Sequence, residues 1–363
     1  MALPGIHLPF RFGDETSTPS GLDPDLDHPL YRMLEALSEA GSVQHAATVL
    51  GMSYRHLWGR LRDWEERLDE PLVLWVRGQS ARLTPLAQQR LAAYRMARAR
   101  LAPHLDAVRQ ELAGALAVGG PPAFADLSLD TEHEPLMMRL RERAFEMSAL
   151  SLRLRLASSG AAWDATVAGR CQLAALALPP RRDGDLAGVE GSTAGKPGRL
   201  WRIPCFRRMQ GLLVAPGNPL AVSSLADAVR RGLRFIDAEP GNGRRQLAER
   251  HLREAGLDSC KLNRVGTEPT ASAAAMAVAL GYGDLTFGPS SQAEGLALDF
   301  LPLVEEEWVV ICHSDTVDTP ALQALMRVLR SAAWCEDVIA TNGCSPSPEA
   351  GTPVELLQPG ESL

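Results

Sequence analysis

Residues 41–68 constrain the fold of this chain most, because they read as two short helices joined by a tight turn. Ser42 is suited to cap the first helix, and Gly51 can adopt the left-handed conformation that ends a helix. Ser53 then caps a second helix. Its apolar side chains recur three and four residues apart, at Leu57, Leu61, Trp64 and Leu68.

The opposite face of this second helix is polar and rich in hydrogen-bonding side chains. It carries Tyr54, Arg55, His56, Arg60 and Arg62. A short helix, a glycine turn and a helix with a basic first turn form a unit that fits the major groove of DNA. An ordinary helical hairpin with no nucleic-acid partner is the alternative.

The residues that follow predict a β-hairpin wing. Pro71 breaks the chain, residues 72–76 read as a short strand, 77–80 as a turn and 81–83 as the returning strand. The arginines of this wing, Arg77 and Arg82, could reach phosphates or a minor groove.

At this point the sequence AGSVQHAATVLGMSYRHLWGRLRDWEERLDEPLVLWVRGQSARLTPLAQQRL resembles the winged helix-turn-helix of LysR-type transcription regulators. Its GMSYRHLW segment resembles the molybdate-responsive regulator family more closely still. The resemblance implies a DNA-binding domain over residues 28–84. The residues expected to contact DNA are Ser53, Tyr54, Arg55, His56, Arg60, Arg62, Arg77 and Arg82.

A long helix is predicted from Pro85 to about residue 117, in the linker of residues 85–118. Its apolar residues fall seven apart in two rows, a pattern that predicts pairing with a second helix in a homodimer. Packing against its own domain is the alternative. The two rows are Leu91, Leu105 and Leu112, and Tyr94, Leu101 and Val108.

Strand and helix patterns alternate in the C-terminal region, residues 123–340, after a Gly-Gly-Pro-Pro hinge. The predicted strands include residues 210–215 and 308–312. This alternation predicts an α/β fold with parallel sheets covered by helices on both faces. Both ends of the chain, residues 1–27 and 344–363, are rich in Pro and Ser, and we expect them to be flexible.

The segments MQGLLVAPGNPLAVSSLADAV, RFIDAEPGNGRRQLAERHLREAGLD and GDLTFGPSSQAEGLALDFLPLVEEEWVVI resemble the periplasmic-binding-protein-like domain related to molybdate-binding proteins. The resemblance implies two lobes that clamp a ligand at helix N-termini, where N–H groups and helix dipoles favour an anion. The residues expected to bind the effector are Thr131, Ser158, Ser159, Asn242, Gly243, Arg244, Arg245 and Thr270.

The sequence departs from the family pattern within this predicted site. It reads Gly-Asn-Gly-Arg-Arg where the family usually has Gly-Ser-Gly-Thr-Arg, and Ala177 stands where a His is common. Glu132 and Glu134 add negative charge near one turn. Molybdate or tungstate, a small carboxylate such as formate, and an empty pocket therefore all remain open as interpretations.

Other chemistries find little support in the sequence. The six Cys form no CxxC pair, which argues against zinc clusters and disulfides, and no catalytic motif, metal site or cofactor site emerges. No apolar run is long enough to span a bilayer, and the first residues lack the features of a signal peptide, so we expect a cytoplasmic protein and no membrane partner.

The net charge is −7, yet residues 30–117 hold twelve Arg against nine Asp and Glu. The favoured interpretation is a one-component bacterial transcription regulator that is not an enzyme. It would bind promoter DNA as a homodimer or homotetramer and respond to a small anionic effector. The alternative is a cytoplasmic anion-binding or enzymatic domain whose winged helix mediates protein contacts.

Overall fold

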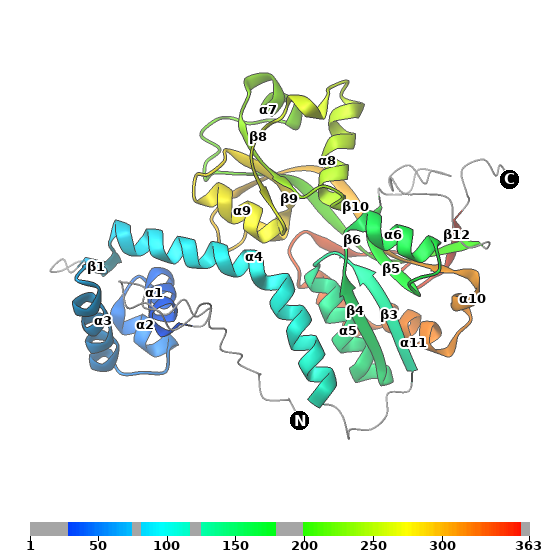
Figure 1. The fold of residues 1–363 in the computed structure, drawn as a ribbon, viewed down its shortest axis with the longest axis horizontal. Coiled ribbons are helices and arrows are strands. Elements are labelled where there is room, and N and C mark those ends of the chain that lie inside the picture. The colour runs from blue at the N-terminus through cyan, green and yellow to red at the C-terminus, as the bar shows by residue number, and fades with distance from the viewer. Residues whose placement is uncertain (1–27, 75–80, 117–124, 179–198, 357–363) are drawn as a thin grey trace. The chain divides into compact units, whose positions relative to one another are not determined.

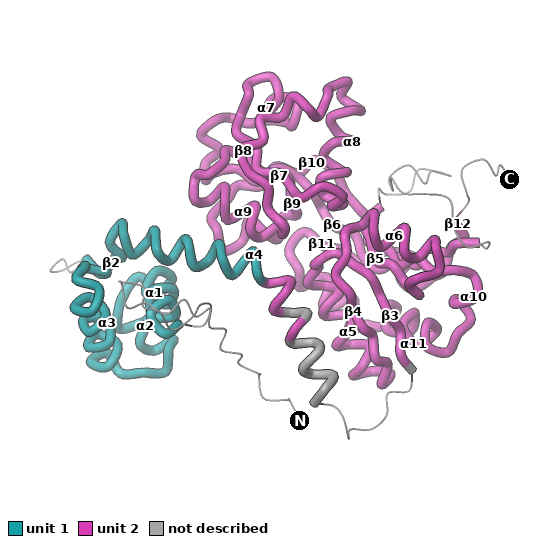
Figure 2. The backbone as a smooth tube through the Cα atoms, in the orientation of Figure 1, with its two compact units in different colours: residues 1–101 teal, residues 102–363 magenta. Residues whose placement is uncertain are grey.

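The computed structural model describes residues 28–74, 81–116, 125–178 and 199–356 (Figure 1). They divide into two compact units, residues 1–101 and 102–363, which are considered separately below (Figure 2). Within the described ranges, no helix combines the length and the apolar character needed to cross a membrane.

The first unit begins with three helices, α1 (Pro29–Ala40), α2 (Val43–Val49) and α3 (Tyr54–Leu68). Ser42 caps α2 and Ser53 caps α3, as the sequence predicts, and the Gly51 between these helices has a φ of 68°. The predicted helix-turn-helix is therefore confirmed. Its core is formed by buried side chains that include Leu34, Leu37, Ala46, Leu57, Leu61 and Trp64.

A two-stranded hairpin follows α3. Strand β1 (Val73–Leu74) runs antiparallel to β2 (Arg82–Leu83). The buried Glu65 carboxylate fastens the hairpin to α3, because it accepts hydrogen bonds from the backbone N–H groups of Leu72 and Val73 at 2.8 and 3.0 Å. The tip of the predicted wing, including Arg77, lies outside the described residues.

The long helix α4 (Pro85–Leu116) contains 32 residues, with Pro103 inside it. Leu91 and Tyr94, which the heptad pattern assigned to a seam with a partner helix, are instead buried in the core of the first unit. Tyr94 stacks on Tyr31 of α1 at 4.3 Å between ring centroids. The first part of the predicted seam thus packs against its own domain, as the alternative interpretation predicted.

The second unit contains a mixed sheet with the strand order β4-β3-β5-β10-β6-β9-β7-β8. We call the two halves of this unit, each with its strands and helices, lobe I and lobe II. Lobe I contains β3 (Ala125–Thr131), α5 (Pro135–Ser148), β4 (Leu150–Leu156), α6 (Ser159–Val167), β5 (Leu173–Leu178), α10 (Ser314–Val317), α11 (Pro320–Leu329) and α12 (Ala332–Ile339). Lobe II contains α7 (Leu225–Arg231), β7 (Arg234–Ala238), α8 (Gly243–Glu254), β8 (Asn263–Glu268), α9 (Ala271–Ala279) and β9 (Leu285–Pro289).

Two long antiparallel strands join the lobes, β6 (Leu200–Val214) and β10 (Asp299–His313). β10 also pairs with β5 of lobe I, whereas β6 pairs with β9 of lobe II. The sequence predicted shorter strands here, 210–215 and 308–312. Cross-strand ion pairs near Arg207 and Arg208 explain the difference in length, since charged residues within a strand interrupt its apolar pattern. The predicted parallel pairing is confirmed within each lobe, where β3 pairs with β4 and β5 and β7 pairs with β8 and β9, whereas the strands that join the lobes are antiparallel.

The end of the described chain also differs from expectation. Residues 344–363 were predicted to form a flexible tail, but β11 (Cys344–Pro346) and β12 (Val354–Leu356) both pair antiparallel with β6. Their backbone hydrogen bonds do not depend on an apolar pattern, which is why a Pro- and Ser-rich composition concealed them. The prediction of a flexible tail is therefore wrong for these strands.

Candidate functional site

The first candidate site is the polar face of α3. Leu57, Leu61 and Trp64 are buried and fix the helix on its domain, so that Tyr54, Arg55, His56 and Arg60 are exposed on the other side. The Ser53 hydroxyl accepts a hydrogen bond from the His56 backbone N–H at 3.2 Å. This cap fixes the first turn, in which the exposed polar residues lie.

Two further features of this face concern Arg62 and Trp58. Arg62 pairs with Glu65 at 3.0 Å, and its guanidinium lies 5.5 Å from the centroid of the Trp58 ring. Trp58 is 40% exposed, which is unusual for so large an apolar side chain. Trp58 lies outside the apolar stripe of α3, and its position four residues from both Tyr54 and Arg62 places it on their face. Arg82 is exposed on β2.

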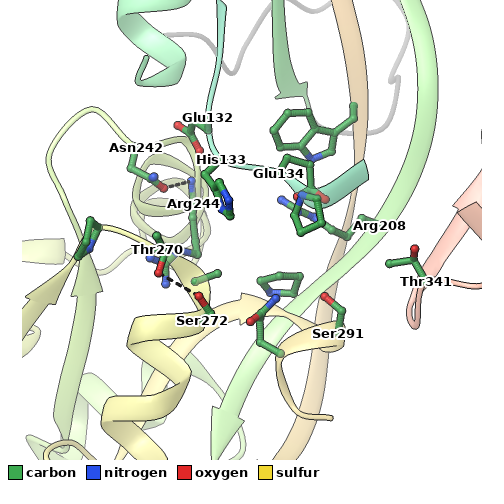
Figure 3. Close-up of a pocket in the computed structure, with 16 residues that line it drawn as sticks. Glu132, His133, Glu134, Arg208, Asn242, Arg244, Thr270, Ser272, Ser291 and Thr341 are labelled. Carbon is green, nitrogen blue, oxygen red and sulfur yellow. Dashed lines mark hydrogen bonds and ion pairs between the residues drawn. The ribbon is translucent and has the colours of Figure 1, made fainter. Parts of the chain in front are cut away.

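The second candidate site is a cavity of about 220 Å³ within the second unit, between residues of lobe I and residues of lobe II (Figure 3). Its charged and hydrogen-bonding lining comes from both lobes. These residues are Glu132, His133, Glu134, Arg208, Asn242, Arg244, Thr270, Ser272, Ser291, Gln292, Trp308 and Thr341.

Arg244, in the first turn of α8, provides a cation to this cavity. Its side chain is 7% exposed, and its Nη1 donates to the Phe287 carbonyl oxygen at 3.0 Å. Its Nη2 is buried and has no hydrogen-bond partner among the described residues. Burial lowers the pKa of Arg244 to about 10, so the guanidinium keeps its charge at neutral pH. An unsatisfied buried charged donor is costly, and an acceptor on a ligand would relieve that cost.

Arg208, on β6, is the second buried guanidinium of the lining, but its charge is satisfied within the protein. It pairs with Glu134 and with Glu306, and it lies 5.2 Å from the centroid of the Trp308 ring. Burial opposes its charge, yet Glu306 and Glu134 outweigh that effect and hold its pKa above the ordinary value. Gln210 also donates to Glu306 at 2.7 Å.

Glu132, in the loop between β3 and α5, connects the two lobes. Its Oε1 accepts from the Ser159 backbone N–H at 3.0 Å, the Ser159 hydroxyl at 2.8 Å and the Gly243 backbone N–H at 2.7 Å. Ser159 is the first residue of α6 and Gly243 the first of α8. Burial raises the pKa of Glu132, while these hydrogen bonds and the charge of Arg244 oppose the increase.

Three of the predicted effector residues line the cavity, and all three lie at the starts of lobe II helices: Asn242, Arg244 and Thr270. Asn242 caps α8, and its side-chain oxygen accepts from the Arg244 backbone N–H at 3.0 Å. Thr270 caps α9 and lies 3.0 Å from the Ser272 hydroxyl (Figure 3).

The other predicted effector residues lie elsewhere. Ser159 and Gly243 bind Glu132, and Ser158 caps α6 through the Ala161 N–H. Thr131 is fully buried and donates to the Glu132 carbonyl oxygen. Arg245 pairs with Glu249 at 3.0 Å and is not part of the cavity lining.

The comparisons with known families agree with this architecture. Residues 141–330 match the family described as PBP superfamily domain, which is more than half of the chain. The chain belongs to the PBP superfamily. Residues 30–88 also match the family described as bacterial regulatory helix-turn-helix protein, lysR family. In domain order, a segment that matches the lysR-family regulatory helix-turn-helix precedes the PBP superfamily domain.

Individual proteins resemble the chain more distantly. It is 28% identical over 178 residues to the uncharacterized protein YvgK of Bacillus subtilis (strain 168). This match spans 48% of the chain and 56% of that relative, so the chain spans little more than half the length of the curated relative.

Among solved structures, a probable transcriptional regulator from Pseudomonas aeruginosa is 20% identical, with a TM-score of 0.41 over 84% of this chain and 97% of that one. CbnR, a LysR family transcriptional regulator, is 17% identical, with a TM-score of 0.40 over 83% of this chain and 97% of that one.

Proposed function

We propose that this protein is a one-component transcription regulator that binds promoter DNA through α3 and responds to a small anion bound between lobes I and II. The observation that carries the proposal is the exposed polar face of α3 in a helix-turn-helix of the lysR family. Tyr54, Arg55, His56 and Arg60 can reach base edges or phosphates there, and Arg82 of the hairpin can contact the DNA backbone.

The proposed effector is a monoanion, with a small carboxylate such as formate or acetate favoured over molybdate or tungstate. The unpartnered Nη2 of Arg244 supports an anion, because a carboxylate oxygen would satisfy it. Glu132 and Glu134 are the other charged lining residues besides Arg208 and Arg244. Arg208 is paired with Glu134 and Glu306, so Arg244 is the guanidinium of the lining that keeps an unpartnered nitrogen, and a second ligand charge would lack a counter-charge.

The DNA-binding proposal predicts that Arg55→Ala and Arg60→Ala weaken operator binding. A bidentate contact from Arg to guanine contributes about 1–3 kcal/mol of discrimination. Replacing an Arg that contacts a base should therefore lower the operator affinity of the protein about five-fold or more at fixed salt. Gel shifts with DNA from upstream of the chain's own gene, together with an unrelated duplex, would measure both affinity and specificity.

Arg32→Ala is the matched control, since Arg32 is an exposed arginine on α1 rather than on α3. It should change affinity less than either α3 variant. Equal binding by all four proteins would show that α3 does not read the DNA. An intact protein that binds no duplex would instead favour the alternative of protein contacts, for which the exposed Trp58 and Val49 are suitable.

We further propose that the protein assembles as a homodimer through the later turns of α4. Leu101, Leu105 and Val108 are only half-buried in the single chain and recur four and three residues apart on one face of the helix. A two-fold pairing of this face would place two helix-turn-helix domains on a palindromic site. Pairing of such dimers would give a tetramer.

Leu105→Glu should therefore dissociate the oligomer, because it places a charge in an apolar helix seam. Light scattering should show a lower mass, and operator affinity should fall about ten-fold or more as one of two reading heads is lost. The neighbouring exposed residue provides a control, since His104→Glu should leave the mass unchanged. An unchanged mass for Leu105→Glu would place the dimer contact elsewhere.

A further inference from the structure

The N-termini of two helices from different lobes meet at one point of the second unit, and a side chain already lies there. α6 of lobe I has nine residues and α8 of lobe II has twelve. A Cβ added to Gly243 would lie 2.8 Å from the Ser159 hydroxyl oxygen, which shows how closely the two helix starts approach. Converging N–H groups and helix dipoles make such a point suited to an oxyanion.

The carboxylate of Glu132 occupies this position. Its Oε1 accepts from two backbone N–H groups and one hydroxyl, at 2.7 to 3.0 Å. Backbone N–H groups can only donate, so this oxygen acts as an acceptor, as the oxygen of a bound anion would. The Glu132 carboxylate therefore accepts the hydrogen bonds of donors that could otherwise bind a ligand.

The neighbouring lining shows which donor remains for a ligand. The Nη2 of Arg244 is buried and unpartnered among the described residues, while Arg208 is neutralised by Glu134 and Glu306. One free guanidinium nitrogen is suited to a single anionic oxygen. A dianion would have to approach the Glu132 carboxylate with no second free cation in the lining, and like charges repel strongly where solvent is excluded.

We propose that Glu132 is a specificity-determining residue: an internal anion at the α6–α8 junction that links the lobes and excludes doubly charged oxyanions from the cleft. The proposal rests on the proposed anion-binding function for its biological meaning. The expectation that removal of Glu132 creates an oxyanion site does not depend on which effector the protein binds naturally.

The test is calorimetry on the full-length protein with sodium molybdate, sulfate and acetate. Glu132→Ala frees the donors of Ser159 and Gly243, so it should bind molybdate or sulfate at least about ten-fold more tightly than the wild type does. Glu132→Gln is the matched control, because its amide oxygen still accepts from the same donors while the negative charge is lost. It should gain less than Glu132→Ala, and the gain that it does show measures the contribution of charge repulsion alone.

Two outcomes would overturn the proposal. One is a folded Glu132→Ala protein, verified by circular dichroism, that binds these dianions no better than the wild type. The other is tight molybdate binding by the wild type that Ser159→Ala weakens, a measurement that does not require Glu132→Ala to fold. A gain in Glu132→Ala with no acetate binding by the wild type would support the role of Glu132 and contradict only the proposed effector.

Discussion

Arg208→Ala should destabilise the second unit by about 3–5 kcal/mol, because removing one partner of a buried ion network leaves uncompensated charge in the protein interior. Arg208 is 11% exposed, and its partners Glu134 and Glu306 are 7% and 3% exposed. Both carboxylates would lose their guanidinium in the variant. Denaturant unfolding, followed by the fluorescence of the Trp residues of this unit, would measure the change in the free energy of unfolding.

The adjacent residue provides a control for this prediction. Arg207 is 36% exposed and contacts Glu305 and Glu307, and Glu307 keeps Arg202 and the Ser347 hydroxyl as other partners. Arg207→Ala should therefore cost about 1 kcal/mol or less. The loss in free energy of unfolding for Arg208→Lys should fall between those of Arg207→Ala and Arg208→Ala, since Lys keeps the charge without the planar guanidinium. Similar unfolding midpoints for Arg207→Ala and Arg208→Ala would show that the buried network contributes little.

The helix-turn-helix could be predicted from sequence because its determinants are local. Ser42, Gly51 and Ser53 act within a few residues of their own positions, and the apolar stripe of α3 follows one helical period. The long strands β6 and β10 could not be predicted in full, because the charged residues in the middle of β6 are matched by Glu305, Glu306 and Glu307 on β10, about a hundred residues later.

The candidate cleft could be predicted only in part, for the same physical reason. The helix starts at Asn242 and Thr270 carry cap residues that a local pattern reveals. Arg208 belongs to the lining through strand register, which no local pattern shows. The sequence also cannot separate Arg244 from Arg245, because adjacent helical residues differ by about 100° in direction and only the packed domain determines which one faces the cavity.

Replacing Arg244 and replacing Arg245 should have very different effects on effector binding. Arg244→Ala should abolish detectable binding of formate or acetate, because truncating the buried partner of a charged hydrogen bond costs about 2–5 kcal/mol, or some thirty-fold and more in affinity. Arg245→Ala removes the same charge from the next residue, but Arg245 pairs with Glu249 outside the cavity lining, so binding should change less than about three-fold.

Calorimetry at a fixed pH near 7 tests this difference, since Arg244, with its pKa lowered to about 10, remains charged there. Arg244→Lys should retain part of the affinity, because an ammonium keeps the charge but cannot contact both the Phe287 carbonyl and a ligand with the same planar geometry. Acetate or formate binding that is equally strong in wild type and in a folded Arg244→Ala protein would show that the unpartnered Nη2 is not the anion contact. Loss in Arg245→Ala alone would assign the contact to the neighbouring residue and require α8 to rotate or shift when the effector binds.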